Sequence, residues 1–158
     1  MNNYGFNPKE AYEEYKSLVY RLALARTGDR NDAEDVLQEV FYRYMRNKPD
    51  FENRDHGKAW FITVTINCTK SLFNSAYRKR QAPLTEDLKS EDMEMDTTLS
   101  VVLSLPQKYR TVIHLYYYED YSIKEIADLL HCGDNTVKTR LARGREKLKN
   151  ALGSEIDV

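Results

Sequence analysis

Residues 122–148 read SIKEIADLLHCGDNTVKTRLARGREKL, and they carry the clearest structural pattern in the chain. Apolar residues recur at helical spacing in its first third, and Ser122 followed by Glu125 is the pattern of a helix capping box. Ala127 is small enough to let a second helix approach closely, and Val137 can fill the space between the two helices. The stretch therefore predicts a helix-turn-helix, a motif whose second helix can lie in the DNA major groove.

The turn between the two helices has an unusual residue. His131 stands where a glycine usually sits, and a positive φ angle costs a non-glycine residue energy, although His tolerates it better than most. Gly133 follows and can take over part of the turn or cap the second helix. An ordinary helical hairpin with a solvated basic surface is the alternative to a helix-turn-helix.

The second predicted helix is strongly basic, with six cations against two acids over residues 134–149. In a recognition helix the first residues face base edges, and later cations contact phosphate. The base-edge candidates are Asn135, Thr136, Lys138 and Thr139. The phosphate-contact candidates are Arg140, Arg143 and Arg145.

Charge is unevenly distributed along the 158 residues, although the formal net charge is only −1. Residues 67–80 carry four cations and no acid, whereas residues 81–100 carry six acids and one Lys. Residues 81–96 are poor in large apolar groups and have no sustained periodicity, which predicts a flexible acidic linker. The expected fold is all-α, with two small helical domains at residues 1–80 and 97–158, the second containing the helix-turn-helix.

Turn and capping residues divide the first domain into three expected helices. The first helix is expected to end near Gly28, and Asp29 or Asn31 can begin the second. Pro49 ends the second helix. A loop then precedes a third helix, which is expected to begin near Lys58 and to close at residues 77–80.

Two blocks of this sequence resemble bacterial RNA polymerase sigma factors of the extracytoplasmic-function type. The first block is DAEDVLQEVF at residues 32–41. The second block lies within residues 105–148 and consists of five separate pieces: LP at 105–106, Arg110, EIA at 125–127, TVKTRL at 136–141 and RGREKL at 143–148. The blocks stand in the family's order, separated by a linker, and the resemblance covers nearly the whole chain. It implies a promoter-specificity subunit whose first domain reads the minus-ten element and whose second reads the minus-thirty-five element.

The resemblance implies that the first block docks on the core polymerase. Residues spaced by four share one side of a helix. The docking candidates are Asp32, Asp35, Gln38, Glu39 and Arg43. The alternative for these residues is a solvated surface with a Glu39–Arg43 pair worth a few tenths of a kcal/mol.

The third helix resembles the segment that reads the minus-ten element. Promoter opening traps unstacked bases on aromatic rings, while Lys and Arg follow the phosphates. The minus-ten candidates are Trp60, Asn67, Lys70, Arg78, Lys79 and Arg80. Trp60 and Phe73 are also core candidates, and Arg78–Arg80 can equally be a solvated helix end. The chain departs from the family pattern around Asn67, at Ile66, Ser71 and Asn74.

Catalysis, a cofactor and a metal site are not expected. The sequence has no Gly-rich phosphate loop and no paired-histidine motif, and Cys68 and Cys132 are expected to be reduced. No apolar run approaches membrane-spanning length and no secretory signal is present, so a cytoplasmic protein without membrane insertion is expected. The resemblance implies core RNA polymerase, promoter DNA and an anti-sigma factor as partners. The rival function is a sigma-like DNA-binding transcriptional regulator or adaptor that does not itself open promoters.

Overall fold

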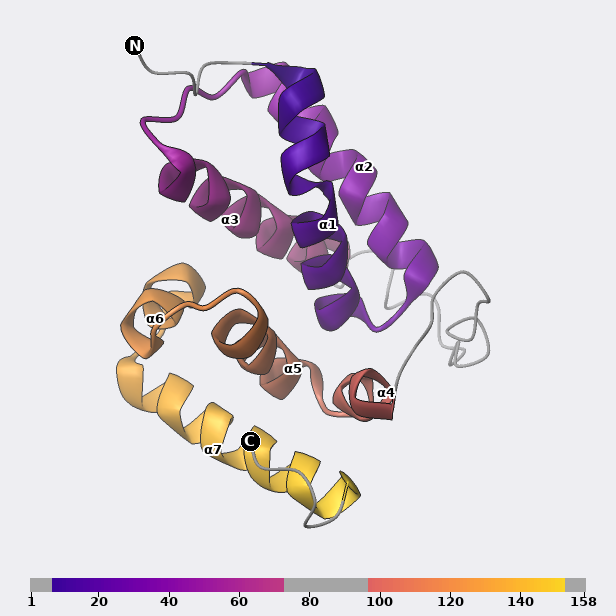
Figure 1. Cartoon of the computed structure of the whole chain (residues 1–158), viewed down its shortest axis with the longest axis vertical. Coiled ribbons are helices and arrows are strands. Elements are labelled where there is room, and N and C mark those ends of the chain that lie inside the picture. The colour runs from indigo at the N-terminus through magenta and orange to yellow at the C-terminus, as the bar shows by residue number, and fades with distance from the viewer. Residues whose placement is uncertain (1–6, 73–96, 153–158) are drawn as a thin grey trace. The chain divides into compact units, whose positions relative to one another are not determined.

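The computed structural model describes residues 7–72 and 97–152 (Figure 1). The regular elements within those ranges are all helices, which confirms the expected all-α fold. The chain divides into two compact units, unit 1 at Met1–Leu84 and unit 2 at Thr85–Val158. The predicted linker at residues 81–96 lies outside the described residues.

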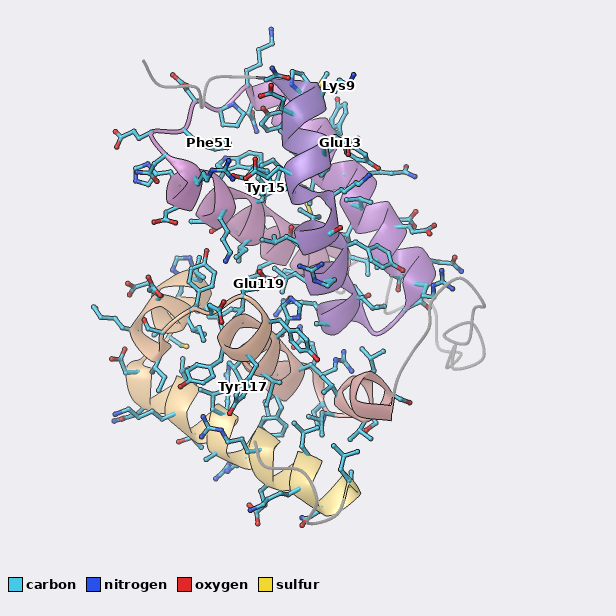
Figure 2. All side chains as sticks on the ribbon, viewed as in Figure 1. Lys9, Glu13, Tyr15, Phe51, Tyr117 and Glu119 are labelled. Atoms are coloured by element: carbon cyan, nitrogen blue, oxygen red, sulfur yellow. The ribbon has the colours of Figure 1, made fainter. Side chains whose placement is uncertain are left out.

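Unit 1 contains three helices, α1 (Pro8–Thr27), α2 (Arg30–Asn47) and α3 (Arg54–Leu72), and α1 packs against both others. Its core is rich in aromatic rings. Tyr15 of α1 stacks on Phe61 of α3 with ring centroids 4.4 Å apart, and the Tyr15 side chain lies between these helices (Figure 2). Phe61 also packs 5.4 Å from the buried ring of Tyr44 on α2. This cluster holds α2 and α3 in a fixed position relative to one another, and so determines which side of α2 faces outward.

The helix ends of unit 1 follow local capping chemistry. Gly28 ends α1 in the left-handed region with φ of 70°, and the Asp29 side chain caps α2 by accepting a hydrogen bond from the backbone N–H of Asp32. Both ends match the sequence prediction. The prediction for α3 was wrong by four residues, because α3 begins at Arg54. The Asn53 side chain accepts the N–H of His56 at 2.9 Å and so starts the helix earlier.

Unit 2 contains α4 (Thr97–Leu103), α5 (Gln107–Ile113), the π-helix η3 (His114–Tyr118), α6 (Ile123–Leu130) and α7 (Asp134–Leu152). Its core consists of fully buried aliphatic side chains from α5, η3, α6 and α7. They are Val112, Leu115, Ile126, Val137 and Leu141. The wide turn of η3 is closed by a contact of 3.1 Å between the His114 Nε2 and Glu119 Oε2 atoms, both of which are buried.

Helices α6 and α7 form the predicted helix-turn-helix. The capping box is present, because the Ser122 side chain accepts the N–H of Glu125 and the Glu125 carboxylate accepts the N–H of Ser122. His131 ends α6 in the left-handed region with φ of 58° and ψ of 48°, as its position predicts. Ala127 and Val137 are both buried where the two helices meet.

No helix in the described part of the chain combines the length and the apolar character that crossing a membrane requires.

Candidate functional site

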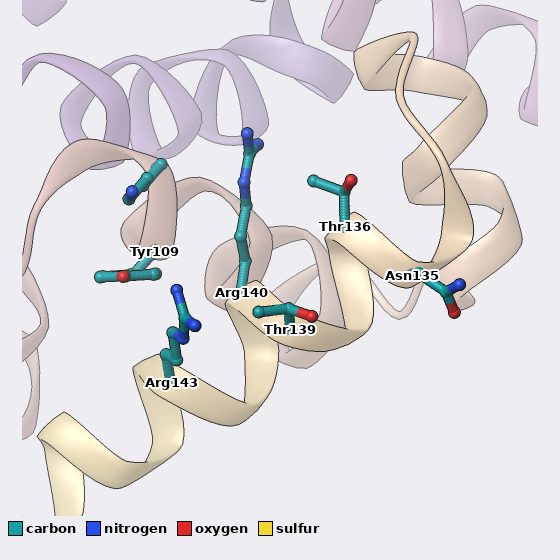
Figure 3. A pocket seen from close by; sticks show the side chains of 7 residues that line it. Tyr109, Asn135, Thr136, Thr139, Arg140 and Arg143 are labelled. Atoms are coloured by element: carbon teal, nitrogen blue, oxygen red, sulfur yellow. The ribbon is translucent and has the colours of Figure 1, made fainter.

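A groove of about 310 Å³ runs between α5 and α7 on unit 2 (Figure 3). Its lining comes from two residues of α5 and five of α7. These residues are Lys108, Tyr109, Asn135, Thr136, Thr139, Arg140 and Arg143. The five from α7 all belong to the predicted minus-thirty-five candidates. The structure therefore brings most of that predicted set into one continuous surface.

The amphipathic pattern of α7 determines which residues line the groove. Val137, Leu141 and Leu148 recur at helical spacing and are buried against the rest of unit 2, so the polar residues between them point outward. Gly144 also lies on the buried side, and a Cβ atom there would stand 3.1 Å from Ile113 Cδ1. A glycine at this position therefore lets α5 and α7 pack closely, which keeps Lys108 beside the arginines of α7.

Two groove residues on α5 were not predicted from the sequence. The Lys108 Nζ atom lies 5.2 Å from the centroid of the Tyr109 ring, and the Lys147 Nζ atom of α7 lies 5.8 Å from the same ring. The Tyr109 side chain is almost fully buried beneath these cations. No sequence motif near Lys108 and Tyr109 predicts that they line a groove. The groove forms only where α5 meets α7, which lies some thirty residues further along the chain.

Arg145 differs from the other cations predicted on α7. Its Nε atom donates a hydrogen bond of 2.7 Å to the Tyr117 hydroxyl. Its guanidinium carbon lies 5.7 Å and 5.8 Å from the ring centroids of Tyr116 and Tyr117. Arg145 is therefore engaged with η3 and is not among the groove residues, in contrast to its predicted grouping with the phosphate contacts. Lys138 is exposed on α7 but also does not line the groove.

The minus-ten candidates in the described part of α3 differ in their exposure. Asn67 and Lys70 are exposed on its last two turns. Trp60 is only half-exposed and packs 4.9 Å from the Phe61 ring and 5.9 Å from the Tyr44 ring, so its contacts favour the core alternative. The remaining candidates, Arg78, Lys79 and Arg80, and the core candidate Phe73 lie outside the described residues.

The outer surface of α2 carries most of the predicted docking residues. Asp35, Gln38 and Glu39 are exposed, and Arg43 is half-exposed with its Nε atom 2.9 Å from Glu39 Oε2. Asp32 departs from the prediction because its side chain is only 5% exposed. It lies in the first turn of α2, on the side that faces the interior of unit 1.

Two large apolar side chains on α2 add to this surface, although the sequence prediction did not include them. Tyr42 is 57% exposed and Met45 is 49% exposed. The Arg46 guanidinium lies over the Tyr42 ring, 5.3 Å from its centroid. Exposed apolar residues beside charged ones are common where a protein surface binds a partner. The exposure of Tyr42 and Met45 is not evident from residue type, because Tyr44 between them is almost fully buried.

The surroundings of Arg43 and Cys68 shift the pKa values of these two side chains. The hydrogen bond that the Arg43 guanidinium donates to the Glu39 carboxylate raises the pKa of Arg43. On α3, burial raises the pKa of the nearby Cys68 thiol to about 11, and the opposing influence of the Arg43 charge is smaller. Cys68 is therefore a protonated thiol at neutral pH and a poor nucleophile. Within residues 7–72 and 97–152, no group of three or more His, Cys, Asp or Glu residues could hold a metal ion.

Comparisons with known proteins agree with the geometry of both units. Residues 11–81 match the family described as Sigma-70 region 2, and residues 97–148 match Sigma-70, region 4. The ECF RNA polymerase sigma factor SigW of Bacillus subtilis (strain 168) is 32% identical over 158 residues, covering 87% of this chain and 84% of SigW. The RNA polymerase sigma factor SigV of the same organism is 30% identical over 148 residues, covering 90% of this chain and 89% of SigV.

Solved structures share the fold at lower sequence identity. The sigma factor RpoE from Bartonella quintana, in complex with the anti-sigma factor NepR, aligns with a TM-score of 0.74 at 19% identity, covering 94% of this chain and 98% of RpoE. CnrH, in complex with the cytosolic domain of CnrY, aligns with a TM-score of 0.64 at 23% identity, covering 94% of this chain and 89% of CnrH. SigW and SigV, each at least 30% identical to this chain, align over most of their own length and most of this chain. The match to region 2 precedes the match to region 4 along the sequence. The chain therefore belongs to the ECF family of RNA polymerase sigma factors, which direct promoter-specific initiation of transcription.

Proposed function

We propose that the two parts of this sigma factor divide promoter recognition between them. Residues 1–80 dock on core polymerase and read the minus-ten element, residues 97–158 read the minus-thirty-five element, and residues 81–96 link the two. The observation that carries this proposal is the basic groove between α5 and α7, which adjoins the exposed side of the helix-turn-helix. Cations beside a recognition helix are what binding to a DNA backbone requires.

Core polymerase binds the outer surface of α2 in this proposal. Asp35, Gln38 and Glu39 contact the polymerase directly, and Arg43 holds the Glu39 carboxylate in place through their 2.9 Å contact. Tyr42 and Met45 supply exposed apolar area next to these charges. A surface that combines apolar side chains with a few directed charges favours specific protein binding over simple solvation.

Promoter DNA contacts both units. On α3, the exposed Asn67 reads a base of the minus-ten element and Lys70 contacts phosphate. Arg78, Lys79 and Arg80 are proposed as further phosphate contacts. On α7, the base-edge residues are Asn135, Thr136, Lys138 and Thr139, and the phosphate contacts are Arg140 and Arg143. Arg145 serves instead to hold η3 against α7. Trp60 supports α3 from within the aromatic cluster.

An anti-sigma factor is the regulatory partner that we propose. RpoE of Bartonella quintana is bound to NepR, and CnrH is bound to the cytosolic domain of CnrY. A partner of this class would inhibit the present chain by covering the α2 surface or the α7 groove. The proposed site of action is the cytoplasm, where bacterial core polymerase transcribes DNA. The family is non-enzymatic, and we propose that this chain likewise has no catalytic activity of its own.

Reconstituted transcription tests this function. The purified chain is added to bacterial core polymerase that lacks sigma, on fragmented genomic DNA from the source organism, and transcript starts are sequenced. Discrete starts that share two upstream motifs are expected. An Arg140→Ala, Arg143→Ala variant should lose those starts while it still binds core.

The other outcomes support the rival functions. Stable core binding without specific starts would favour an adaptor that does not open promoters. DNA binding without core binding would favour a transcriptional regulator that works independently of polymerase.

A further inference from the structure

We propose that Arg26 and Thr69 are positioning residues for recognition of the minus-ten element, because the hydrogen bond between them orients the turn of α3 that carries Asn67. Neither residue contacts DNA in this proposal, since both side chains are buried. The inference rests on the proposed function, in which Asn67 reads a base of the minus-ten element, and it adds two residues that act through Asn67.

A chain of two hydrogen bonds connects α1 to the backbone of α3. The Arg26 Nε atom donates to the Thr69 Oγ1 atom at 2.8 Å, across 43 positions of sequence. The Thr69 hydroxyl in turn donates to the Ile66 carbonyl oxygen at 2.7 Å. A hydroxyl group has one donor hydrogen and two acceptor lone pairs, so Thr69 can form both bonds at once. The Ile66 carbonyl belongs to the peptide unit that also contains the Asn67 nitrogen, so the chain of bonds ends directly at Asn67.

Burial makes this connection stronger than a surface contact. Arg26 lies in the last turn of α1 and is only 6% exposed, and Thr69 is fully buried. A guanidinium withdrawn from water has to keep its hydrogen bonds, because an unpaired buried charge is costly. A hydrogen bond from an ionised donor is also roughly twice as strong as one between neutral groups. The bond between Arg26 and Thr69 therefore restricts the rotation of α3 about its own axis.

The same turn of α3 presents polar residues outward. Cys68 and Thr69 are buried, whereas Asn67 and Lys70 are exposed and lie three residues apart on one side of the helix. An amide discriminates between bases only when its oxygen and its nitrogen each face a matching group, so its orientation matters. Hydrogen bonds beneath a binding residue can hold it to within about 0.5 Å of the required position. The Arg26–Thr69 bond therefore supports the base contact of Asn67 without making one itself.

Thr65 offers a close comparison on the same helix. It is also fully buried, and its hydroxyl donates to the Phe61 carbonyl oxygen of α3 at 2.6 Å. A Thr-to-Val change at position 65 or 69 keeps the shape of the side chain and removes a bond of the same kind within α3. Only the change at Thr69 also removes the bond to Arg26. The two variants therefore differ mainly in whether the connection to α1 is lost.

The test measures base discrimination by the full chain bound to core polymerase. Transcript yield from a mapped promoter is compared with the yield from promoters in which each minus-ten base is replaced in turn, and Asn67→Ala identifies the base that Asn67 reads. Loss of one base contact lowers discrimination at that position by roughly tenfold. Thr69→Val should approach this loss at the same position and leave the other minus-ten positions unchanged. Thr69→Ser, which keeps the hydroxyl, and Thr65→Val should both behave like wild type.

A double variant shows whether Thr69 acts through Asn67. In an Asn67→Ala background, Thr69→Val should cause no further loss at that position, because effects on one shared contact are not additive. Arg26→Met should reproduce the loss seen in Thr69→Val, and circular dichroism confirms that each variant is folded.

The outcomes separate this inference from the function on which it rests. Discrimination like that of Thr65→Val in either Thr69→Val or Arg26→Met overturns the inference, and so does an equal loss at every minus-ten position. Unchanged discrimination in Asn67→Ala at every position overturns the proposed base contact itself, together with the inference that rests on it, so the two failures are distinguishable.

Discussion

Reversing one charge on the α2 surface separates a docking role from a structural one. In Glu39→Lys the 2.9 Å contact with Arg43 is lost and two cations face each other four residues apart. The side chains of Arg43 and Glu39 are 30% and 47% exposed, so solvent screens the pair and its attraction is about 0.3–0.5 kcal/mol. Replacing this attraction with a similar repulsion should lower the free energy of unfolding by about 0.6–1 kcal/mol.

The same substitution should weaken core binding far more. A charge reversed within a protein interface costs at least about 2 kcal/mol, which corresponds to roughly a 30-fold loss of affinity. The assay titrates fluorescently labelled chain with core polymerase, and thermal unfolding of the free chain is followed by circular dichroism. The expected result is a melting temperature lowered by no more than about 8 °C together with a 30-fold or greater rise in Kd.

Two further variants sharpen this comparison. Glu13→Lys breaks a more exposed pair with Lys16 on α1 and should leave core affinity unchanged. The double variant Glu39→Lys, Arg43→Glu restores an ion pair of opposite polarity, so it should recover stability without recovering core affinity. Core affinity within threefold of wild type in Glu39→Lys would refute the docking role and leave the solvated-surface alternative.

Three more predictions concern the folding of the units and the charge on α7. Ser122→Ala should lower the melting temperature of unit 2 by removing about 1 kcal/mol of capping stabilisation, whereas Ser122→Asp should not; an unchanged melting temperature in the Ala variant contradicts the capping role. Arg145→Ala should destabilise unit 2 by about 1–2 kcal/mol and leave the salt dependence of promoter binding unchanged. Arg143→Ala should instead lower the salt dependence and leave the stability of unit 2 unchanged. A lower salt dependence in Arg145→Ala would show that Arg145 contacts phosphate after all. Because burial raises the pKa of Cys68 to about 11, the unfolded thiol ionises first, and stability should fall as pH rises from about 9 to about 11. Over this pH range, denaturant titrations should show that the free energy of unfolding falls by about 2–3 kcal/mol less in Cys68→Ala than in wild type. Identical pH profiles of the two proteins would exclude the thiol as the source of the decline.

The features that could be predicted from the sequence are those fixed by neighbouring residues. The Ser122 cap and its Glu125 partner are three residues apart, and the left-handed conformation of His131 follows from its place in the turn. The start of α3 was missed although its signal is equally local, since Asn53 is a good helix-capping residue.

The features that could not be predicted depend on residues far apart in the chain. The Arg145 Nε atom reaches the Tyr117 hydroxyl across 28 positions of sequence, and no pattern around Arg145 indicates that pairing. Lys108 joins the groove only because Gly144 lets α5 approach α7. Cation content therefore identified the right helix but could not separate the charges that face the groove from those that pack against tyrosine.

The π-helix η3 makes the number of residues before the helix-turn-helix as important as their identity. Its hydrogen bond from the N–H of Glu119 to the carbonyl of His114 spans five residues at 3.2 Å, one more than an α-helix allows. A residue inserted or deleted here without a change of turn type would rotate everything in unit 2 that follows by about 100°. Sequence insertions and deletions should therefore be far less tolerated here than at a surface loop, even where the amino-acid type is not restricted.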